Sequence, residues 1–273
     1  MTAKAVVLAA GRGTRLCPLT PFLPKEMLPV EGLPVIHHVL KELVSIGITE
    51  VMIILSEGKD LIRDYLTGMV SPKGRDAELL SDERARILSS LKIFFAKQEE
   101  LLGTAHAIGI AASFMGEDPL LVVYPDDLLY DPVDRSISAD STRKLWEICR
   151  NTGKSVLMAV EIPGSTASQY GVMRLHARER DIVVTSIVEK PKDYMERLAY
   201  ALIGRMVITP EIMRSIPKHR MSDGEGIIPV LSEAAANGRL LAVIHKGARY
   251  DLGSHRGYHY LLRDLLREEK YIR

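Results

Sequence analysis

The chain of 273 residues is long enough for one large α/β domain or two small ones, and its 26% charged and 47% hydrophobic residues are ordinary for a globular protein. Its 36 Lys and Arg residues balance 35 Asp and Glu residues to a formal net charge of +1, which argues against a nucleic-acid binder or a binder of anionic membranes. No apolar run is long enough to cross a membrane. The two cysteines, Cys17 and Cys149, form no C-x-x-C pair. With no signal peptide recognised, we expect a cytoplasmic protein that has neither nucleic-acid nor membrane partners.

The first half of the chain alternates short apolar runs with amphipathic ones. Runs too short for helices predict buried strands at residues 5–9, 51–55, 91–96 and 120–124. Between the first two, apolar residues recur at helical spacing from Pro34 to Gly47, with proline at the start and glycine at the end as helices prefer. Alternation of strand and helix predicts a mostly parallel sheet with helices on both faces. Ligands of such sheets bind at the carboxyl ends of the strands, where the loop after the first strand emerges.

The second half has apolar runs with little helix between them, at residues 155–162, 172–175, 182–188 and 202–208. We interpret them as strands that extend the same sheet into a mixed one, so that residues 1–273 form one α/β domain. The charged segment 71–86 is expected to leave the body of the domain as an exposed helix. Apolar residues on one face of 258–266 predict a closing helix packed on that body. The adjacent His37 and His38 are expected at the surface or edge of their helix.

The stretch 8–29, LAAGRGTRLCPLTPFLPKEMLP, fits neither the dinucleotide pattern G-x-G-x-x-G nor the P-loop pattern G-x-x-x-x-G-K-[ST]. Gly11 and Gly13 let backbone N–H groups approach a phosphate, and Arg15 adds a guanidinium. A glycine pair after a strand is equally compatible with a plain tight turn. Lys25 favours the phosphate interpretation, because the prolines around it restrict the backbone that carries it. An arginine and a lysine around one glycine loop predict a clamp for a polyphosphate.

The combined motif L-A-A-G-x-G-T-R-L-x-P-L-T followed by P-K-E-M-L-P resembles the signature of the sugar-1-phosphate nucleotidyltransferases. P-K-E-M-L-P is most similar to the bacterial branch that joins UTP to glucose 1-phosphate. The resemblance covers nearly the whole chain and implies a Rossmann-like, glycosyltransferase-A-like fold with a nucleotide-binding half, 1–150, and a sugar-phosphate-binding half, 151–273. It also implies nucleotide contacts at Ala10, Gly11, Gly13 and Thr14 and catalytic roles for Arg15 and Lys25.

The block KQEELLGTAHAI, residues 97–108, offers a glutamine amide and a glycine where a base could bind. The amide has one acceptor and two donors, which match the N3–H and flanking carbonyls of uracil or thymine. Alternatively, Gln98 only caps the following helix. The resemblance implies that Gln98, Gly103 and Thr104 contact the base. His106 either touches the substrate or is a partly buried structural histidine.

Two carboxylates in VVYPDDL, residues 122–128, follow a predicted buried strand. Carboxylates at a strand end suit Mg²⁺, which keeps several waters and takes one or two protein carboxylates plus substrate phosphates. The other interpretation is a solvated turn, because aspartates after proline are common in turns. The resemblance implies that Asp126 is a catalytic ligand of Mg²⁺ with Asp127 as its neighbour, and that Asp251 in RYDLGS is the second ligand.

Tyr170 and Gly171 in SQYGVM, then Glu189 and Lys190 in SIVEKPK, follow in the order of the family's later motifs. A carboxylate accepts hydrogen bonds from sugar hydroxyls, and a lysine beside it neutralises a sugar phosphate. By residue type alone, adjacent Glu and Lys are ordinary surface chemistry. The resemblance implies that Gly171, Glu189 and Lys190 bind the sugar phosphate, with Lys190 also catalytic and Arg205 a supporting contact.

The expected reaction is attack of glucose 1-phosphate on the α-phosphorus of UTP, which gives UDP-glucose and pyrophosphate and needs no general base. The same chemistry on dTTP or on N-acetylglucosamine 1-phosphate stays open. The glucose-1-phosphate branch has a lysine where Leu102 stands, and L-G-T-A-H-A is instead similar to the loop of N-acetylglucosamine-1-phosphate uridylyltransferases. This departure weakens the sugar assignment more than the base assignment, since both relatives use UTP.

A non-catalytic sugar-nucleotide sensor on the same fold is the alternative from a different class. A sensor need not keep the predicted catalytic and metal-binding side chains, all of which are present: Arg15, Lys25, Asp126 and Asp251. The segment 222–231 keeps only part of the family's G-D-E-I-Q-L-T pattern. This leaves open whether the chain is a monomer or a homo-oligomer.

Overall fold

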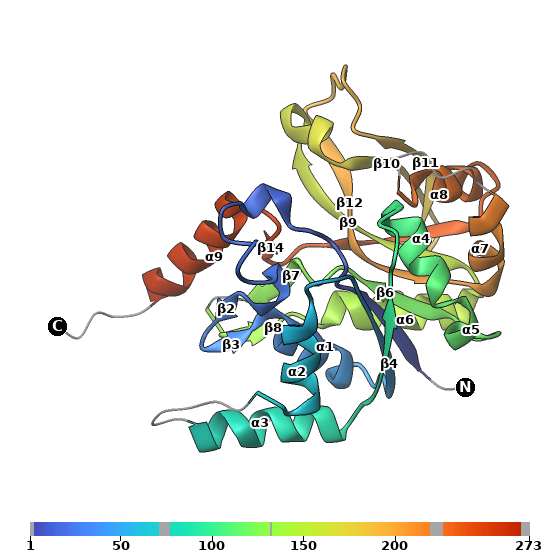
Figure 1. The fold of residues 1–273 in the computed structure, drawn as a ribbon. Helices are drawn as coiled ribbons and strands as arrows, with labels where there is room; N and C mark the ends of the chain where they lie inside the picture. The colour runs from blue at the N-terminus through green and yellow to red at the C-terminus, as the bar shows by residue number, and fades with distance from the viewer. Residues whose placement is uncertain (1–2, 71–76, 132, 219–225, 269–273) are drawn as a thin grey trace.

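The computed structural model describes residues 3–70, 77–131, 133–218 and 226–268. Within these ranges the central feature is a nine-stranded sheet (Figure 1). Its strands are β1 (Lys4–Leu8), β4 (Glu50–Leu55), β5 (Lys92–Lys97), β6 (Leu120–Val123), β9 (Ser155–Pro163), β10 (Gly171–Arg178), β11 (Asp181–Glu189), β12 (Leu198–Ile208) and β13 (Leu240–His245). They lie in the order β10-β11-β13-β9-β12-β6-β1-β4-β5, which places the first strand of the chain inside the sheet.

One half of this sheet, β6-β1-β4-β5, is parallel throughout. β1 lies between β4 and β6, so that Ala5 pairs with both Val51 and Leu121, and β4 pairs in the same sense with β5. Every residue of β6 is buried, as expected for a parallel strand with both faces covered. The four strands predicted in the first half of the chain are therefore confirmed, although β5, at the edge of the sheet, is only partly buried.

The other half of the sheet is largely antiparallel. β12 pairs antiparallel with β6 and β9, and β11 pairs antiparallel with β10 and β13, whereas β9 and β13 are parallel. The strands from β9 to β12 follow one another through short connections, and a parallel pair would need a crossover of about a dozen residues or more. The expectation of a mixed sheet is confirmed, but the expectation of a mostly parallel one holds for the first half alone.

Helices cover both faces of the sheet and form two hydrophobic cores with it (Figure 1). One face carries α1 (Val35–Ser45), α2 (Asp60–Thr67) and α6 (Asp140–Thr152). The other face carries α4 (Gly103–Ile110), α5 (Ala112–Met115), α7 (Pro210–Ser215) and α8 (Ile228–Ala236). Of the apolar residues that recur at helical spacing in α1, Ile36, Val39, Leu40 and Leu43 are buried and Val44 is partly buried. No described helix combines the length and apolar character needed to cross a membrane.

A third core joins the two ends of the chain beside the main sheet. Here β14 (Arg249–Asp251), β7 (Asp127–Asp131) and β8 (Ser136–Ile137) form a small antiparallel sheet, next to the hairpin of β2 (Pro29–Val30) and β3 (Leu33–Pro34). The closing helix α9 (His255–Glu268) packs here, as predicted, with Leu261 buried in the same cluster as Leu16 and Leu128. This packing holds the opening loop against the segment that contains Asp251.

Short 3₁₀ helices shape several of the connections between the strands and helices. They are η1 (Thr14–Leu16), η2 (Lys25–Met27), η3 (Gly164–Gln169) and η4 (Ile216–Lys218). Two of the predicted catalytic cations lie on them, Arg15 on η1 and Lys25 on η2. Each of these two turns follows a residue that a sequence pattern can identify, Gly13 or Pro24. Both cations therefore sit on short turns of fixed geometry rather than on long loops.

The charged segment 71–86 contains the helix that the sequence predicts, α3 (Ala77–Ser89), while residues 71–76 lie outside the described ranges. This helix packs on α1 instead of standing apart. Arg84 is buried and donates a hydrogen bond to the Val70 carbonyl. One side of the helix is therefore attached to the body of the domain, while Glu78, Asp82, Ala85 and Arg86 are exposed, as the sequence predicts.

His37 and His38 are buried, so the expectation that they lie at the surface of their helix is wrong. His37 Nδ1 lies 2.9 Å from the Tyr65 hydroxyl, and His38 Nε2 lies 2.9 Å from the Val30 carbonyl oxygen. Burial lowers the pKa of both imidazoles, that of His37 to about 4. Helix α3 packs on α1 and brings Glu83 to 3.8 Å from His37 Nε2. It covers a part of α1 that would be exposed to solvent if α1 were considered alone.

Candidate active site

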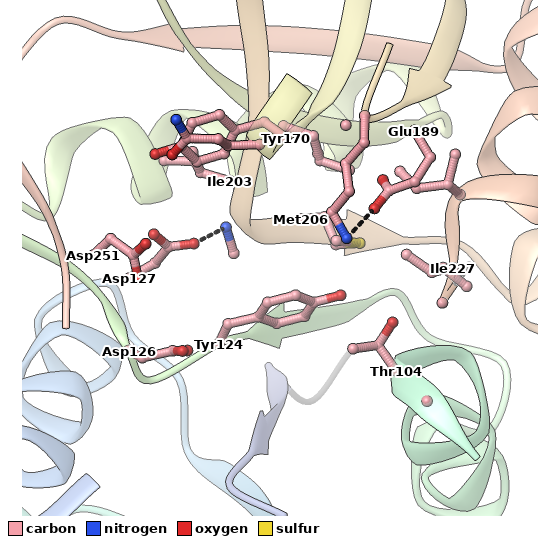
Figure 2. A pocket seen from close by; sticks show the side chains of 18 of the residues that line it. Thr104, Tyr124, Asp126, Asp127, Tyr170, Glu189, Ile203, Met206, Ile227 and Asp251 are labelled. Atoms are coloured by element: carbon pink, nitrogen blue, oxygen red, sulfur yellow. Dashed lines mark hydrogen bonds and ion pairs between the residues drawn. The ribbon is translucent and has the colours of Figure 1, made fainter. Parts of the chain in front are cut away.

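A cavity of about 660 Å³ opens at the carboxyl ends of β6 and β11, between the two halves of the sheet. Eight of the predicted site residues line it, together with their neighbours Asp127 and Tyr170: Arg15, Gly103, Thr104, Asp126, Gly171, Glu189, Lys190 and Asp251. Figure 2 shows the three aspartates Asp126, Asp127 and Asp251 at one end and Glu189 at the other, with the ring of Tyr124 between them. Residues from both halves of the chain therefore meet in one cavity.

The glycine loop lies beside this cavity, against Lys25. A Cβ added to Gly11 would lie 3.5 Å from Lys25 Nζ, so the loop backbone and the ammonium are neighbours. Gly13 has a φ of 68° and would place a Cβ 2.8 Å from Thr20 Cγ2, so a larger residue would be strained and would clash. The Thr20 hydroxyl donates to the Gly13 carbonyl at 2.9 Å and fixes the turn. The turn therefore requires glycine at position 13. The four predicted nucleotide contacts of this loop are not among the residues that line the cavity: Ala10, Gly11, Gly13 and Thr14.

Lys25 and Asp126 form an ion pair at the edge of the cavity. Lys25 Nζ donates to Asp126 Oδ2 at 2.6 Å, and the two side chains are only 12% and 17% exposed. Burial disfavours both charges, but each partner outweighs it: the pKa of Lys25 is raised and the pKa of Asp126 is lowered. Both groups are therefore charged at neutral pH. Lys25 does not line the cavity itself but contacts Asp126, which does.

Arg15 and Asp251 form a second ion pair, with NH1 donating to Oδ2 at 3.2 Å, and the two pairs converge at Gly253. A Cβ built on Gly253 would lie 2.6 Å from Asp126 Oδ2, 2.7 Å from Arg15 NH2 and 3.0 Å from Asp251 Oδ1. Two carboxylates, one from the middle of the chain and one from near its C-terminal end, thus face one point that a side chain would fill. Among the described residues no three His, Cys, Asp or Glu side chains gather around one point. The two carboxylates fit a cation that completes its shell with water and substrate oxygens, as Mg²⁺ does.

Asp127 differs from Asp126 in having both oxygens occupied by the protein. Its Oδ2 accepts from the Gly204 N–H at 2.7 Å, and its Oδ1 accepts from Arg249 Nε at 2.6 Å. Arg249 also lies 5.5 Å from the centre of the Tyr170 ring, and its neighbours, chiefly Asp127, raise its pKa further above the ordinary value despite burial. Sequence analysis missed Arg249, which lines the cavity. Its position two residues before Asp251 was the available signal, because alternate residues of a strand point the same way.

The predicted sugar-phosphate residues lie together at the far end of the cavity. Gly171 pairs with Glu189 across β10 and β11, and a Cβ on Gly171 would lie 2.9 Å from Ile228 Cδ1 and 3.3 Å from Glu189 Oε2. Lys190 Nζ lies 3.1 Å from Glu189 Oε1. Lys190 has a φ of 44°, unusual for a non-glycine residue, and its N–H donates to the Tyr170 carbonyl at 3.0 Å. The backbone at the end of β11 is therefore held in a conformation that costs energy, as is common at functional sites.

Arg205 does not reach the cavity, so the expectation of a supporting sugar-phosphate contact is corrected. Its side chain is 0% exposed, like that of its partner Glu42. The guanidinium donates to both Glu42 oxygens, at 3.0 and 2.8 Å, and to the Tyr124 carbonyl at 2.9 Å. Gly204 lines the cavity instead, where a Cβ would lie 2.4 Å from Tyr124 Cβ. Strand alternation explains the difference, because neighbouring residues of β12 face opposite sides of the sheet.

Gln98 lies at the end of β5, just behind the part of the cavity that Gly103 and Thr104 line. Its side chain is 4% exposed, and its amide nitrogen lies 3.1 Å from the Gly103 carbonyl oxygen and 3.1 Å from His106 Nδ1. Helix α4 has no side-chain cap at its N-terminus, so Gln98 does not cap it. Gly103 has a φ of 87°, which a residue with a side chain would rarely adopt. Gln98 and His106 therefore form one connected group with the loop that borders the cavity.

Tyr124 is a further lining residue that the sequence analysis did not single out. Its ring spans the floor of the cavity between Asp126 and Thr104 (Figure 2). Burial raises the pKa of its hydroxyl to about 12, against a smaller opposing effect of a hydrogen bond with Thr104. The hydroxyl is therefore neutral over the physiological pH range, and the ring gives the cavity an apolar floor.

The comparisons with known proteins agree with this arrangement. The model of the "Nucleotidyl transferase" family matches residues 4–268. The chain belongs to the nucleotidyl transferase family. This transferase is 32% identical over 265 residues to the UTP–glucose-1-phosphate uridylyltransferase of Staphylococcus epidermidis, a match that covers 93% of this chain and 89% of that protein. It is 31% identical to a putative UTP–glucose-1-phosphate uridylyltransferase of Bacillus subtilis, with 99% of each chain covered.

A solved structure of a UDP-glucose pyrophosphorylase complexed with UDP-glucose has the same fold as this transferase. The two superpose with a TM-score of 0.85 and 26% sequence identity, over 98% of this chain and 100% of that chain. The family that the opening motifs indicate is thereby confirmed over nearly the full length of the chain. The α/β fold with a mixed sheet is confirmed by the same match.

Proposed function

We propose that this transferase moves a uridylyl group from UTP to glucose 1-phosphate, which gives UDP-glucose and pyrophosphate. The observation that carries the proposal is the convergence of Arg15, Asp126 and Asp251 on one point of a cavity whose far end holds Glu189 and Lys190. The cavity thus offers one end for phosphates with a cation and another for a sugar phosphate. The names of the curated relatives support the choice of UTP and glucose 1-phosphate.

In the proposed reaction, a phosphate oxygen of glucose 1-phosphate forms a bond to the α-phosphorus of UTP. The bond between that phosphorus and the oxygen that bridges to the β-phosphorus breaks, and pyrophosphate leaves with the electron pair. The nucleophile is already an anion near neutral pH, so no side chain has to remove a proton. The protein has to hold two polyanions in line against their mutual repulsion, which requires fixed cations and good positioning.

The side chains around the cavity divide this work between its two ends. Arg15, with the backbone N–H groups of 11–14, would hold the phosphates of UTP and the leaving pyrophosphate. Lys25 would act at the α-phosphate, which it can reach because it already lies on the cavity-lining carboxylate Asp126. Lys190 would hold the phosphate of the sugar, and Glu189 would accept hydrogen bonds from sugar hydroxyls.

Asp126 and Asp251 would together hold Mg²⁺. When bound there, the cation would neutralise negative charge on the reacting phosphate oxygens. Lys25 and Arg15 hold these two carboxylates in place, since each donates to one of them. Asp127 serves a different purpose, because its bonds to Gly204 and Arg249 fix the backbone next to Asp126.

The proposal is tested by incubating the protein with UTP, glucose 1-phosphate and Mg²⁺ and measuring UDP-glucose and pyrophosphate. We expect equal amounts of both products, and almost none in excess chelator. Asp126→Asn and Asp251→Asn should each remove most of the turnover, by ~10²-fold or more, in a protein that stays folded, because each replaces a charged carboxylate of the cation site with an amide of the same size. Asp82→Asn, on the exposed side of α3, is the matched control and should be fully active.

Full turnover in chelator would contradict the metal assignment. Wild-type rates in both aspartate variants would contradict the assignment of the cavity as the active site.

A further inference from the structure

The orientation of the Gln98 amide follows from the atoms that surround it. The Gly103 carbonyl oxygen, 3.1 Å away, can only accept a hydrogen bond, so the amide group nearest to it must be the donating nitrogen. The second hydrogen of that nitrogen points to His106 Nδ1, also at 3.1 Å. Both donors of the Gln98 side chain are therefore used inside the protein.

The remaining polar atom of Gln98, Oε1, has no donor among the described residues. It is also not sealed in, since the fully buried polar side-chain atoms without a partner in the described chain are Glu26 Oε1 and His37 Nε2. Gln98, which is 4% exposed and contacts Gly103 of the cavity lining, thus has one acceptor left for a ligand and no donor. An acceptor matches the N3–H of uracil, whereas cytosine has an acceptor at that ring position and would be repelled.

The orientation depends on His106 as well as on the Gly103 carbonyl. An imidazole accepts at Nδ1 only when its proton is on Nε2, so the contact with Gln98 selects that tautomer. With His106 accepting, a flipped amide would place its oxygen against two acceptors at once. Without His106, the flipped amide would face one acceptor and would offer its nitrogen to the ligand.

We propose that His106 is a positioning residue that fixes Gln98 as a pure acceptor and so makes the transferase discriminate UTP from CTP. This inference rests on the proposed function and adds the selection of uracil over cytosine to it. His106 does not touch the reacting phosphates in this scheme. It acts through Gln98, whose Oε1 reads the base.

The test is the ratio of kcat/KM for UTP to kcat/KM for CTP, measured with glucose 1-phosphate. His106→Leu keeps the bulk of the side chain but removes the acceptor. We expect it to lower the UTP-to-CTP ratio roughly 3- to 10-fold, which is the effect of one hydrogen bond. The KM for UTP should rise and the KM for CTP should fall. His106→Asn, whose Oδ1 can accept near the position of Nδ1, should keep most of the wild-type ratio.

A combined variant separates positioning from a merely structural role. In a Gln98→Ala background, His106→Leu should leave the ratio unchanged, because there is no amide left to orient. Calorimetric binding of UTP and CTP to the same variants gives a second measure that does not depend on turnover.

The inference is wrong if the wild type prefers UTP and His106→Leu keeps the whole preference, or if His106→Leu lowers the ratio equally in the Gln98→Ala background. If the wild type uses CTP as well as UTP, this inference fails without any variant, while the proposed function stands; if the wild type does not turn over UTP at all, the proposed function fails instead.

Discussion

Lys25 and Asp126 hold each other in the charged form at the edge of the cavity, 2.6 Å apart. Burial opposes both charges, yet the pKa of Lys25 is raised and that of Asp126 is lowered, so the pair is stable at neutral pH. A nearly buried ammonium that needs no rearrangement to stay charged is the kind of preorganised group that stabilises a transition state. This makes Lys25 the cation to test first.

Replacing Lys25 by methionine should lower kcat by at least ~10²-fold, since one preorganised charge contact contributes about 2.7–4 kcal/mol to transition-state stabilisation. The matched control is Lys41→Met. Lys41 is an exposed lysine of α1 that forms an ion pair with Glu83 of α3 at 2.9 Å. It should leave kcat unchanged, because the pair lies far from the cavity lining. A well-folded Lys25→Met protein with near-normal kcat would show that the opening stretch is only a structural turn.

At this scale residue types and motifs can be predicted from the sequence. Which side-chain oxygens and nitrogens are already occupied by hydrogen bonds within the protein cannot. Asp126 and Asp127 are adjacent and chemically identical, and only the contacts of Asp127 with Gly204 and Arg249 show that its oxygens are occupied. The place of Arg249 two residues before Asp251 suggests that it faces the cavity, but its contact with Asp127 could not be predicted, because that partner is 122 residues away in the sequence. The assignment of Asp126 as a metal ligand stays a prediction.

At the scale of elements, a buried ion pair ties α1 to β12. Glu42 and Arg205 are both 0% exposed, and Thr142 of α6 also donates to Glu42, at 2.6 Å. Three elements on one face of the sheet therefore share one charged group. This packing explains why Arg205, in a strand that lines the cavity, is a structural residue.

Arg205→Met should lower the free energy of unfolding by about 3–5 kcal/mol, because it leaves Glu42 buried without a counter-charge. The double variant Glu42→Leu/Arg205→Met removes both charges and should recover much of that loss. Urea denaturation of the two variants and the wild type measures the difference. If Arg205→Met were as stable as the wild type but had a raised KM for the sugar 1-phosphate, a direct substrate contact would replace the structural role.

The elements that the sequence predicted well are those with a local signal. Each strand of the parallel half is a short apolar run, and α1 has both its proline start and its glycine end. No local signal predicts that β10, β11 and β12 pair antiparallel, because an apolar run is compatible with parallel and antiparallel pairing alike. Short connections decide it, as a parallel pair would need a longer crossover. The burial of His37 likewise depends on α3, which a pattern within α1 cannot show.

At the scale of the whole molecule, the cavity is assembled from both ends of the chain. The third core packs Leu16 of the opening loop with Leu261 of α9, and the ion pair of Arg15 with Asp251 lies beside it. Local patterns could predict each end, and the resemblance to a family indicated that they act together. The family model over residues 4–268 confirms that resemblance.

The cavity also accounts for why the preferred base and the preferred sugar are separate questions. Gln98, Gly103 and Thr104 lie at the end of the first half of the sheet, whereas Gly171 and Glu189 come from the second half. Sequence changes at one end, such as Leu102, can therefore alter one specificity without the other. Leu102 precedes α4 and is 44% exposed, so it does not anchor the loop by burial.

The central claim is most directly tested by kcat/KM for UTP, dTTP, CTP, ATP and GTP, each with glucose 1-phosphate and Mg²⁺, followed by pyrophosphate release. A purine or a cytosine would leave buried polar groups around Gln98 unpaired, at about 1–3 kcal/mol per group, or roughly a 5- to 150-fold loss in specificity. We predict UTP first, dTTP second and the other three far behind, with this order weakened in Gln98→Ala. Use of ATP or GTP as efficiently as UTP by the wild type would contradict the account of Gln98 and its loop as the base-reading part of a uridylyltransferase.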